Sequence, residues 1–227
     1  MTEKQWLAGT SGEGLAEYWG ERFTERKAHL LMLACCRRHR AHLKNATMIA
    51  ALDAIAAHYA DPVAADAPFE SETLRRLYPR VNAVAGRRVN APGRGIAFGV
   101  LAAVEPASVA SDLQETLRYL VYSCLHDIVS GLPDMDAEHT AQAVLVREVL
   151  GNPFNKKLKI KPAWRTDTVL ALARQVHIDD EFSAMPILAD ALQDAGCDSD
   201  PILNHCRDTA QVHVRGCWVL DMLLGKK

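Results

Sequence analysis

Apolar residues recur along most of the chain at the spacing of helix turns. Between residues 24 and 43, Leu30, Leu33 and Cys36 follow one another at intervals of three, which places them on one face of a helix. The same spacing predicts further helices over residues 45–60, 71–80, 108–130, 137–150, 168–177, 185–195 and 212–224. These segments predict an all-α fold, a multi-helix bundle.

Residues that commonly cap helices stand at several of the expected helix ends. Asp136, Ser183 and Asp200 are candidate N-caps, because a short polar side chain can accept a hydrogen bond from the first turn. Pro201 follows Asp200 at the first helical position, where proline is tolerated. Gly151 is the expected C-cap of the helix that ends at residue 150.

The centre of the chain breaks this pattern. Residues 79–95 hold two prolines, three glycines and two asparagines, which predicts a loop. Residues 96–104 form an apolar run too short to be assigned to helix or buried strand, so we expect a short hairpin or an irregular loop around 80–104. Residues 1–150 are expected to form an N-terminal helical region and residues 151–227 a C-terminal helical block, packed as one globular unit.

Composition and charge narrow the class of protein. The formal net charge is −2, so the chain as a whole is not drawn to nucleic acid or to an anionic membrane. No run approaches the roughly 18 apolar residues of a membrane span, and the first residues lack the basic start and apolar stretch of a signal peptide. We therefore expect a cytoplasmic protein that does not contact membranes and whose cysteines are thiols or metal ligands.

Four segments together resemble a known group of sequences. They are TEKQWLAG near the start, LMLACCRR at 31–38, REVLGNPF at 147–154, and the C-terminal PILADALQDAGCDSDPILNHCR…HVRGCWVLDMLLGKK. This combination is similar to a large paralogous family of uncharacterised bacterial proteins. The resemblance implies fixed end blocks around a variable centre, and it implies no catalytic residues.

The C-terminal block concentrates side chains that can bind a metal. The candidate ligands are Cys197, His205, Cys206, His213 and Cys217. Zinc takes four thiolate or imidazole ligands in a tetrahedron, and His213 and Cys217 would share a face of the helix expected over 212–224. The spacing is not the CxxC of zinc fingers, and free cysteines are also common core residues. No cofactor is expected from the sequence, with zinc as the alternative.

A second candidate metal site is His126–Asp127, on the helix expected over 108–130. This adjacent pair resembles the metal-binding pair of HD-type phosphohydrolases. That pattern needs an upstream histidine, and His58 lies too far away in the sequence to match it. The pair therefore supports only an alternative function, a metal-dependent HD-like hydrolase.

Charge is distributed unevenly along the chain. Residues 74–104 contain no acid but include the candidate phosphate or nucleic-acid contacts Arg75, Arg76, Arg80, Arg87, Arg88 and Arg94. Residues 105–148 hold eight acids against two arginines. A basic face of this kind could bind phosphates, although solvated arginines on a loop are the commoner explanation. It supports a second alternative, a nucleic-acid-binding accessory protein.

No motif predicts catalysis. The glycine-rich stretch at 86–95 matches neither the dinucleotide-binding nor the P-loop pattern, and the chain has no GxSxG elbow. The sequence therefore predicts a helical interaction or scaffold protein of the bacterial cytosol with an unidentified protein partner, and enzymatic activity is not expected.

Overall fold

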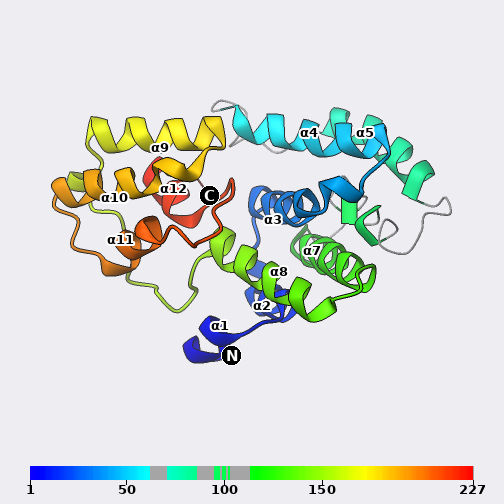
Figure 1. Cartoon of the computed structure of the whole chain (residues 1–227), viewed down its shortest axis with the longest axis horizontal. Helices are drawn as coiled ribbons and strands as arrows, with labels where there is room; N and C mark the ends of the chain where they lie inside the picture. Colours follow the sequence, from blue (N-terminus) through cyan, green and yellow to red (C-terminus); the bar gives the residue numbers. More distant parts are fainter. Residues whose placement is uncertain (62–70, 86–94, 98, 101, 103–112, 227) are drawn as a thin grey trace.

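The computed structural model describes residues 1–61, 71–85, 95–97, 99–100, 102 and 113–226, and within these ranges every regular element is a helix (Figure 1). This confirms the prediction of an all-α fold. None of the helices in these ranges has the length and apolar character needed to cross a lipid bilayer.

The N-terminal region is built around α3. Its helices are α1 (Glu3–Ala8), α2 (Gly12–Trp19), α3 (Glu25–Arg38), α4 (Ala46–Ala60), α5 (Ser71–Ala85), α7 (Leu113–Ser130) and α8 (Met135–Leu150), with short 3₁₀ turns η1 (Gly20–Arg22) and η2 (Arg40–His42). Thr24 caps α3 through its side chain, and all nine consecutive residues from Ala28 to Cys36 are buried. α3 packs against α4, α7 and α8, so it forms the middle of this region (Figure 1).

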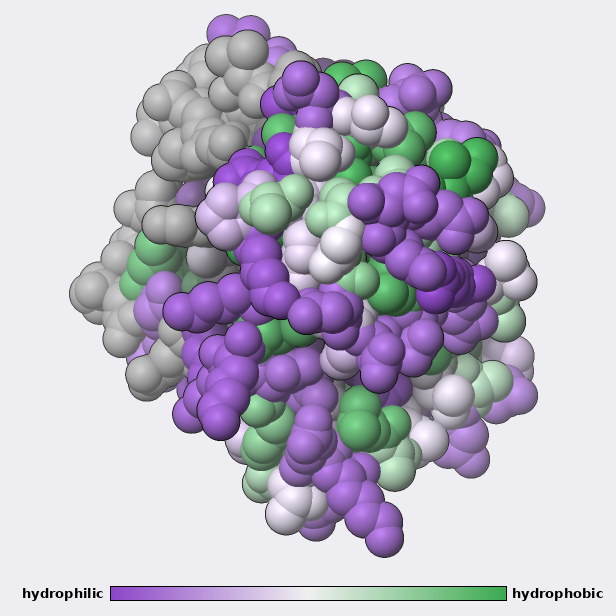
Figure 2. All heavy atoms as spheres, turned by 90° about the vertical axis from the view of Figure 1, so that its left-hand side faces the viewer, coloured by the Kyte–Doolittle hydropathy of each residue, from purple (hydrophilic) through white to green (hydrophobic). Residues whose placement is uncertain are grey.

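The C-terminal block consists of shorter helices. They are η5 (Pro162–Trp164), α9 (Asp167–Asp179), η6 (Phe182–Ala184), α10 (Met185–Asp194), α11 (Asp200–Arg207) and α12 (Trp218–Leu224). α12 packs against α9 and α11, and α10 packs against α9 and α11. The face that this block turns outward is mainly hydrophilic, with hydrophobic residues in small separate groups (Figure 2).

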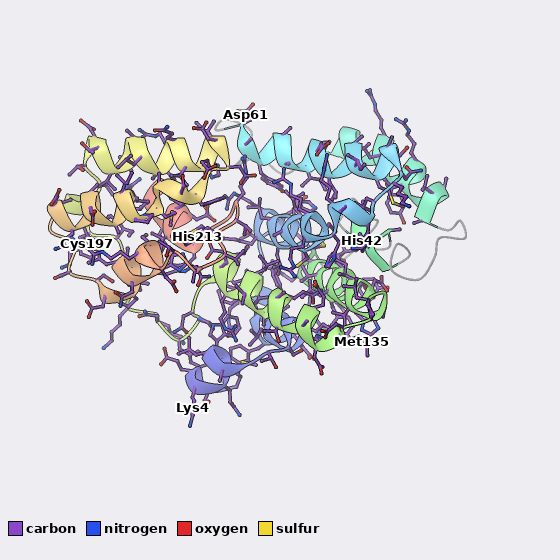
Figure 3. All side chains as sticks on the ribbon, viewed as in Figure 1. Lys4, His42, Asp61, Met135, Cys197 and His213 are labelled. Atoms are coloured by element: carbon purple, nitrogen blue, oxygen red, sulfur yellow. The ribbon has the colours of Figure 1, made fainter. Side chains whose placement is uncertain are left out.

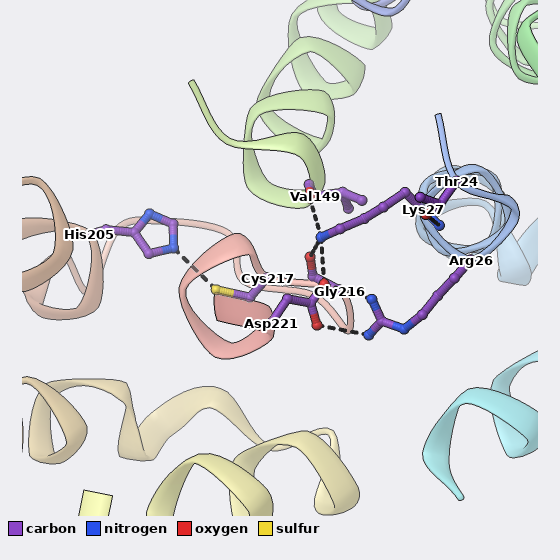
Figure 4. A network of polar contacts seen from close by, with 8 residues as sticks. All are labelled: Thr24, Arg26, Lys27, Val149, His205, Gly216, Cys217 and Asp221. Atoms are coloured by element: carbon purple, nitrogen blue, oxygen red, sulfur yellow. Dashed lines mark hydrogen bonds and ion pairs between the residues drawn. The ribbon is translucent and has the colours of Figure 1, made fainter. Parts of the chain in front are cut away.

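The buried apolar residues form two clusters. One extends from Trp6 to Leu150 in the N-terminal region, and the other from Trp164 to Leu223 in the C-terminal block. Buried polar groups join them: Asp221 of α12 accepts two hydrogen bonds from Arg26 of α3, at 2.7 and 2.8 Å, and a third from Lys27 (Figure 4). Two apolar cores are thus connected by ion pairs as well as by packing.

The prediction of a loop over residues 79–95 is wrong for residues 79–85, which are helical. α5 continues through Pro79 to Ala85, where Val81 and Ala85 are buried. A proline inside a helix removes one backbone hydrogen bond, at a cost of about 3 kcal/mol, and burial of these side chains and packing against α4 oppose that cost. Residues 95–97 and 99–100 are also helical, and no described residue between 80 and 104 lies in a hairpin; residues 86–94 and 103–104 lie outside the described ranges.

Three predicted N-caps are shifted by one or two residues. Asp134, not Asp136, caps α8 by accepting a hydrogen bond from the backbone of Ala137. Ser183 belongs to η6, so α10 begins at Met185 without a side-chain cap. Asp200 is the first residue of α11, directly after the N-cap position. Neighbouring acids and serines compete for the same role, and tertiary packing selects among them.

Candidate metal centre

Four side chains that can bind a metal converge between the two apolar cores. Glu148 comes from the last turn of α8, His205 from α11, His213 from the segment that joins α11 to α12, and Cys217 from the N-cap position of α12. One potential ligand atom from each lies within 4.8 Å of the others. Among the described residues this is the group of histidine, cysteine and acidic side chains with metal-binding geometry.

The contacts within the group are short. Glu148 Oε1 lies 3.1 Å from His213 Nδ1, and Glu148 Oε2 lies 3.3 Å from His205 Nε2. His205 Nε2 is also 3.3 Å from the sulfur of Cys217 (Figure 4). Tetrahedral zinc with bonds of about 2.0 to 2.3 Å places its ligand atoms about 3.3 to 3.7 Å apart. The three contacts lie at or just below this range, whereas the group as a whole extends to 4.8 Å, so the four donor atoms would have to adjust their positions to surround a tetrahedral ion.

The group is shielded from solvent. The side chain of Glu148 is fully buried, those of His205 and His213 are 11% and 6% exposed, and Cys217 is buried. Burial raises the pKa of the Cys217 thiol well above its ordinary value, and the Glu148 carboxylate raises it further. Burial lowers the pKa of His205, which Glu148 partly opposes. Without a metal, these directions favour a neutral thiol at Cys217 and a neutral imidazole at His205.

A bound divalent cation would change the protonation states and the net charge of the group. Metal binding deprotonates a cysteine and takes the neutral form of histidine. A carboxylate, a thiolate and two neutral imidazoles carry two negative charges, which match one divalent ion. Sulfur, nitrogen and oxygen donors together suit zinc, whereas calcium and magnesium prefer oxygen alone. The donor set fits zinc in number, charge and chemical type.

Three neighbouring side chains contact the four residues of the group. The indole Nε1 of Trp218 donates to His205 Nδ1 at 3.3 Å, and Gln211 Nε2 lies 3.5 Å from Glu148 Oε2. Phe182 stacks on the His213 ring, with ring centroids 6.0 Å apart. A neutral His205 that accepts from Trp218 carries its hydrogen on Nε2, facing Glu148. A metal bound at Nε2 would instead require the hydrogen on Nδ1, which could then no longer accept a hydrogen bond from Trp218. The hydrogen bond between Trp218 and His205 therefore distinguishes the metal-free group from the metal-bound one.

The prediction that His213 and Cys217 share a helix face is wrong. α12 begins only at Trp218, and residues 212–217 are not helical. Gly216 adopts a φ of +96°, a conformation that glycine tolerates and that ends any helical path before α12. A Cβ at this position would lie only 3.0 Å from a methyl carbon of Leu30. The turn at Gly216, not helical periodicity, brings His213 and Cys217 together.

The other two predicted cysteine ligands lie outside the group. Cys197 and Cys206 are buried in the C-terminal apolar cluster. Cys197 lies toward the outer end of this block, whereas His213 lies between the two parts of the molecule (Figure 3). Burial raises the pKa of the Cys206 thiol to about 12, as expected for a cysteine in an apolar core.

Glu148 was not among the metal ligands predicted from the sequence. A usable signal is present, because Glu148 follows the buried Leu145 by three positions and so lies on the apolar face of α8. A carboxylate on such a face is rarely buried without a partner. That position would have identified Glu148 as a buried acid, although not which residues it meets.

The remaining candidates are dispersed. His126 is exposed and lies 3.4 Å from Glu13, and neither it nor Asp127 joins a metal-binding group within the described ranges. Burial raises the pKa of Asp127. Arg75, Arg76 and Arg80 lie on α5, the last two exposed, whereas Arg87, Arg88 and Arg94 lie outside the described residues.

Comparison with known proteins adds no relative. No family model matches the chain, and neither a curated protein nor a solved structure matches it. The family resemblance read from the sequence therefore stays an expectation.

Proposed function

We propose that this protein is a helical binding module whose two parts are joined by a structural zinc ion held by Glu148, His205, His213 and Cys217. The observation that carries the proposal is the convergence of these four donors within 4.8 Å in a buried position. One donor comes from α8 and three from the C-terminal block, so the ion would connect the two apolar cores.

The number of donors favours a structural role. Catalytic zinc has three protein ligands and keeps one position for water or substrate, whereas structural zinc is closed by four protein ligands. Glu148, His205, His213 and Cys217 supply four, and little of their surface reaches solvent. A metal enclosed in this way stabilises shape, which suits a protein that presents a fixed surface to a partner.

The test is metal analysis of protein purified without chelator or metal-affinity tag. We expect one zinc per chain, and we expect a strong chelator to lower the Tm because binding free energy contributes to folding. Cys217→Ser and His213→Ala should each lose the stoichiometric metal.

Cys206→Ser is the matched control. Cys206 is a buried cysteine of the same block but lies outside the group, so this variant should lose stability through packing while it retains zinc. The competing arrangement is a metal-free hydrogen-bonded network in which both histidines contact Glu148. Metal-free wild-type protein whose Tm does not change with added zinc would establish that arrangement and refute the proposal.

A further inference from the structure

A concave site of different composition also borders His213. It is a hollow of about 330 Å³ between α3 and the segments that precede η6 and α12. Its polar lining includes the guanidinium groups of Arg37, Arg38 and Arg215 and the carboxylate of Asp180. Leu30, Val214 and Phe182 contribute apolar walls. Hollows of this size accommodate small organic ligands.

The charges around the hollow are not balanced. Its lining contains three guanidinium groups and one carboxylate, an excess of two positive charges. Asp180 is shared between two of them, because Arg37 Nη1 lies 2.8 Å from one carboxylate oxygen and Arg215 Nε lies 3.5 Å from the other. Arg38 makes a longer contact of 3.4 Å with Glu138, which also contacts His39. The carboxylates nearby are therefore divided among several cations.

Among the three arginines, Arg215 has the buried guanidinium whose hydrogen-bond donors are least satisfied. Its side chain is only 6% exposed, and its Nη2 donates to the carbonyl oxygen of Ile178 at 3.2 Å. Its Nη1 is buried and finds no hydrogen-bond partner within the described part of the chain. An unsatisfied buried donor of a charged group is costly, which favours an anion in the hollow.

We propose that this hollow binds a small organic phosphate monoester. A phosphate monoester carries a charge close to −2 at neutral pH, which matches the excess charge of the lining. Its oxygens suit the forked donors of arginine. The ring of Phe182 and the apolar walls would contact the organic part of the ligand. This site does not depend on the proposed zinc, although His213 borders both.

Calorimetric titration of the full-length protein tests this inference, in a buffer free of phosphate. Phenyl phosphate is the probe. Inorganic phosphate and phenol are the comparison ligands, because each presents only one of the two parts of phenyl phosphate. We expect phenyl phosphate to bind more tightly than inorganic phosphate, and phenol not to bind detectably. Arg37→Gln should weaken phenyl phosphate binding about ten-fold, the effect of one charge-assisted hydrogen bond. Arg37 is partly exposed, so this change should leave the fold intact.

Arg40→Gln is the matched control. Arg40 lies close in sequence, carries the same charge and pairs with Asp53, but it does not line the hollow. This variant should bind phenyl phosphate as the wild type does. Equal weakening by Arg37→Gln and Arg40→Gln would show nonspecific attraction and overturn the proposal.

A third variant should strengthen binding of phenyl phosphate instead of weakening it. Asp180→Asn removes the carboxylate that competes with the ligand for Arg37 and Arg215, so it should tighten phenyl phosphate binding about three-fold or more. Asp180 has a φ of 56°, a conformation that asparagine tolerates better than most residues. Unchanged or weaker binding by this variant, or no binding of phenyl phosphate to the wild type, would refute the site.

Discussion

Asp221 is the position at which a single substitution should most weaken the connection between the two cores. Its carboxylate is 3% exposed and accepts hydrogen bonds from Arg26 and Lys27 of α3 (Figure 4). Lys27 also donates to the carbonyl oxygens of Val149 and Gly216, at 2.6 and 2.9 Å. Asp221→Asn keeps the shape of the side chain but removes the negative charge that two buried cations share.

The expected magnitude follows from burial. Burial by itself would raise the pKa of Asp221, but Lys27 and Arg26 outweigh it and hold the pKa below its ordinary value, so the carboxylate is charged in the folded protein. Removing one partner of a buried ion pair costs about 3 to 5 kcal/mol, because the remaining charge is left without compensation. Arg26 is only 6% exposed and cannot regain full hydration. We therefore expect Asp221→Asn to lower the free energy of unfolding by about 4 kcal/mol.

Equilibrium urea denaturation measures this change, with an unchanged m-value as the check on two-state behaviour. The matched control is Asp53→Asn. Asp53 also accepts two hydrogen bonds from one arginine, Arg40, at 2.7 and 3.0 Å, but both side chains are close to half exposed. Exposed pairs contribute about 0 to 1 kcal/mol, so this control should change stability little.

The two substitutions differ mainly in burial, which makes the comparison decisive. Similar small losses for Asp221→Asn and Asp53→Asn would refute the claim that Asp221 holds buried charge between the cores. A large loss for Asp221→Asn accompanied by a lower m-value would instead indicate that the two cores unfold separately once the connection is broken.

Three further predictions concern pH, metal and nucleic acid. Burial, followed by the nearby charge of His58, lowers the pKa of His29 from 6.5 to about 4, so the contribution of His29 to folding stability should be fully present above pH 6.5 and should fall by about 3 kcal/mol as the pH drops toward 4. Burial also lowers the pKa of His177 to about 4, so His29→Gln should remove only the His29 share of this pH dependence in urea titrations at successive pH values. Zinc removal should change the tryptophan emission through the contact of Trp218 with His205, and Trp218→Phe should abolish this response in fluorescence titrations. We expect no nucleic-acid binding at physiological salt; salt-sensitive binding that is lost when Arg87 and Arg88 are both changed to Glu would contradict this.

Local periodicity was sufficient to predict most of the helices. Leu30, Leu33 and Cys36 are all buried on α3, as their spacing predicts, because the repeat of a helix determines which side chains share a face wherever the helix packs. The irregular centre was predicted less well. Pro79 signals a helix end in isolation, but the packing of α5 against α4 carries the helix past it to Ala85.

The candidate metal centre depended on contacts that no local pattern encodes. His205, His213 and Cys217 were selected by residue type, but the reason given for His213 and Cys217, a shared helix face, does not hold. Glu148 lies far from them in sequence and meets them only because α8 packs against α12. Sequence determined the helices through interactions within a few residues, whereas the meeting of α8 with the turn at Gly216 is a property of how the two cores pack.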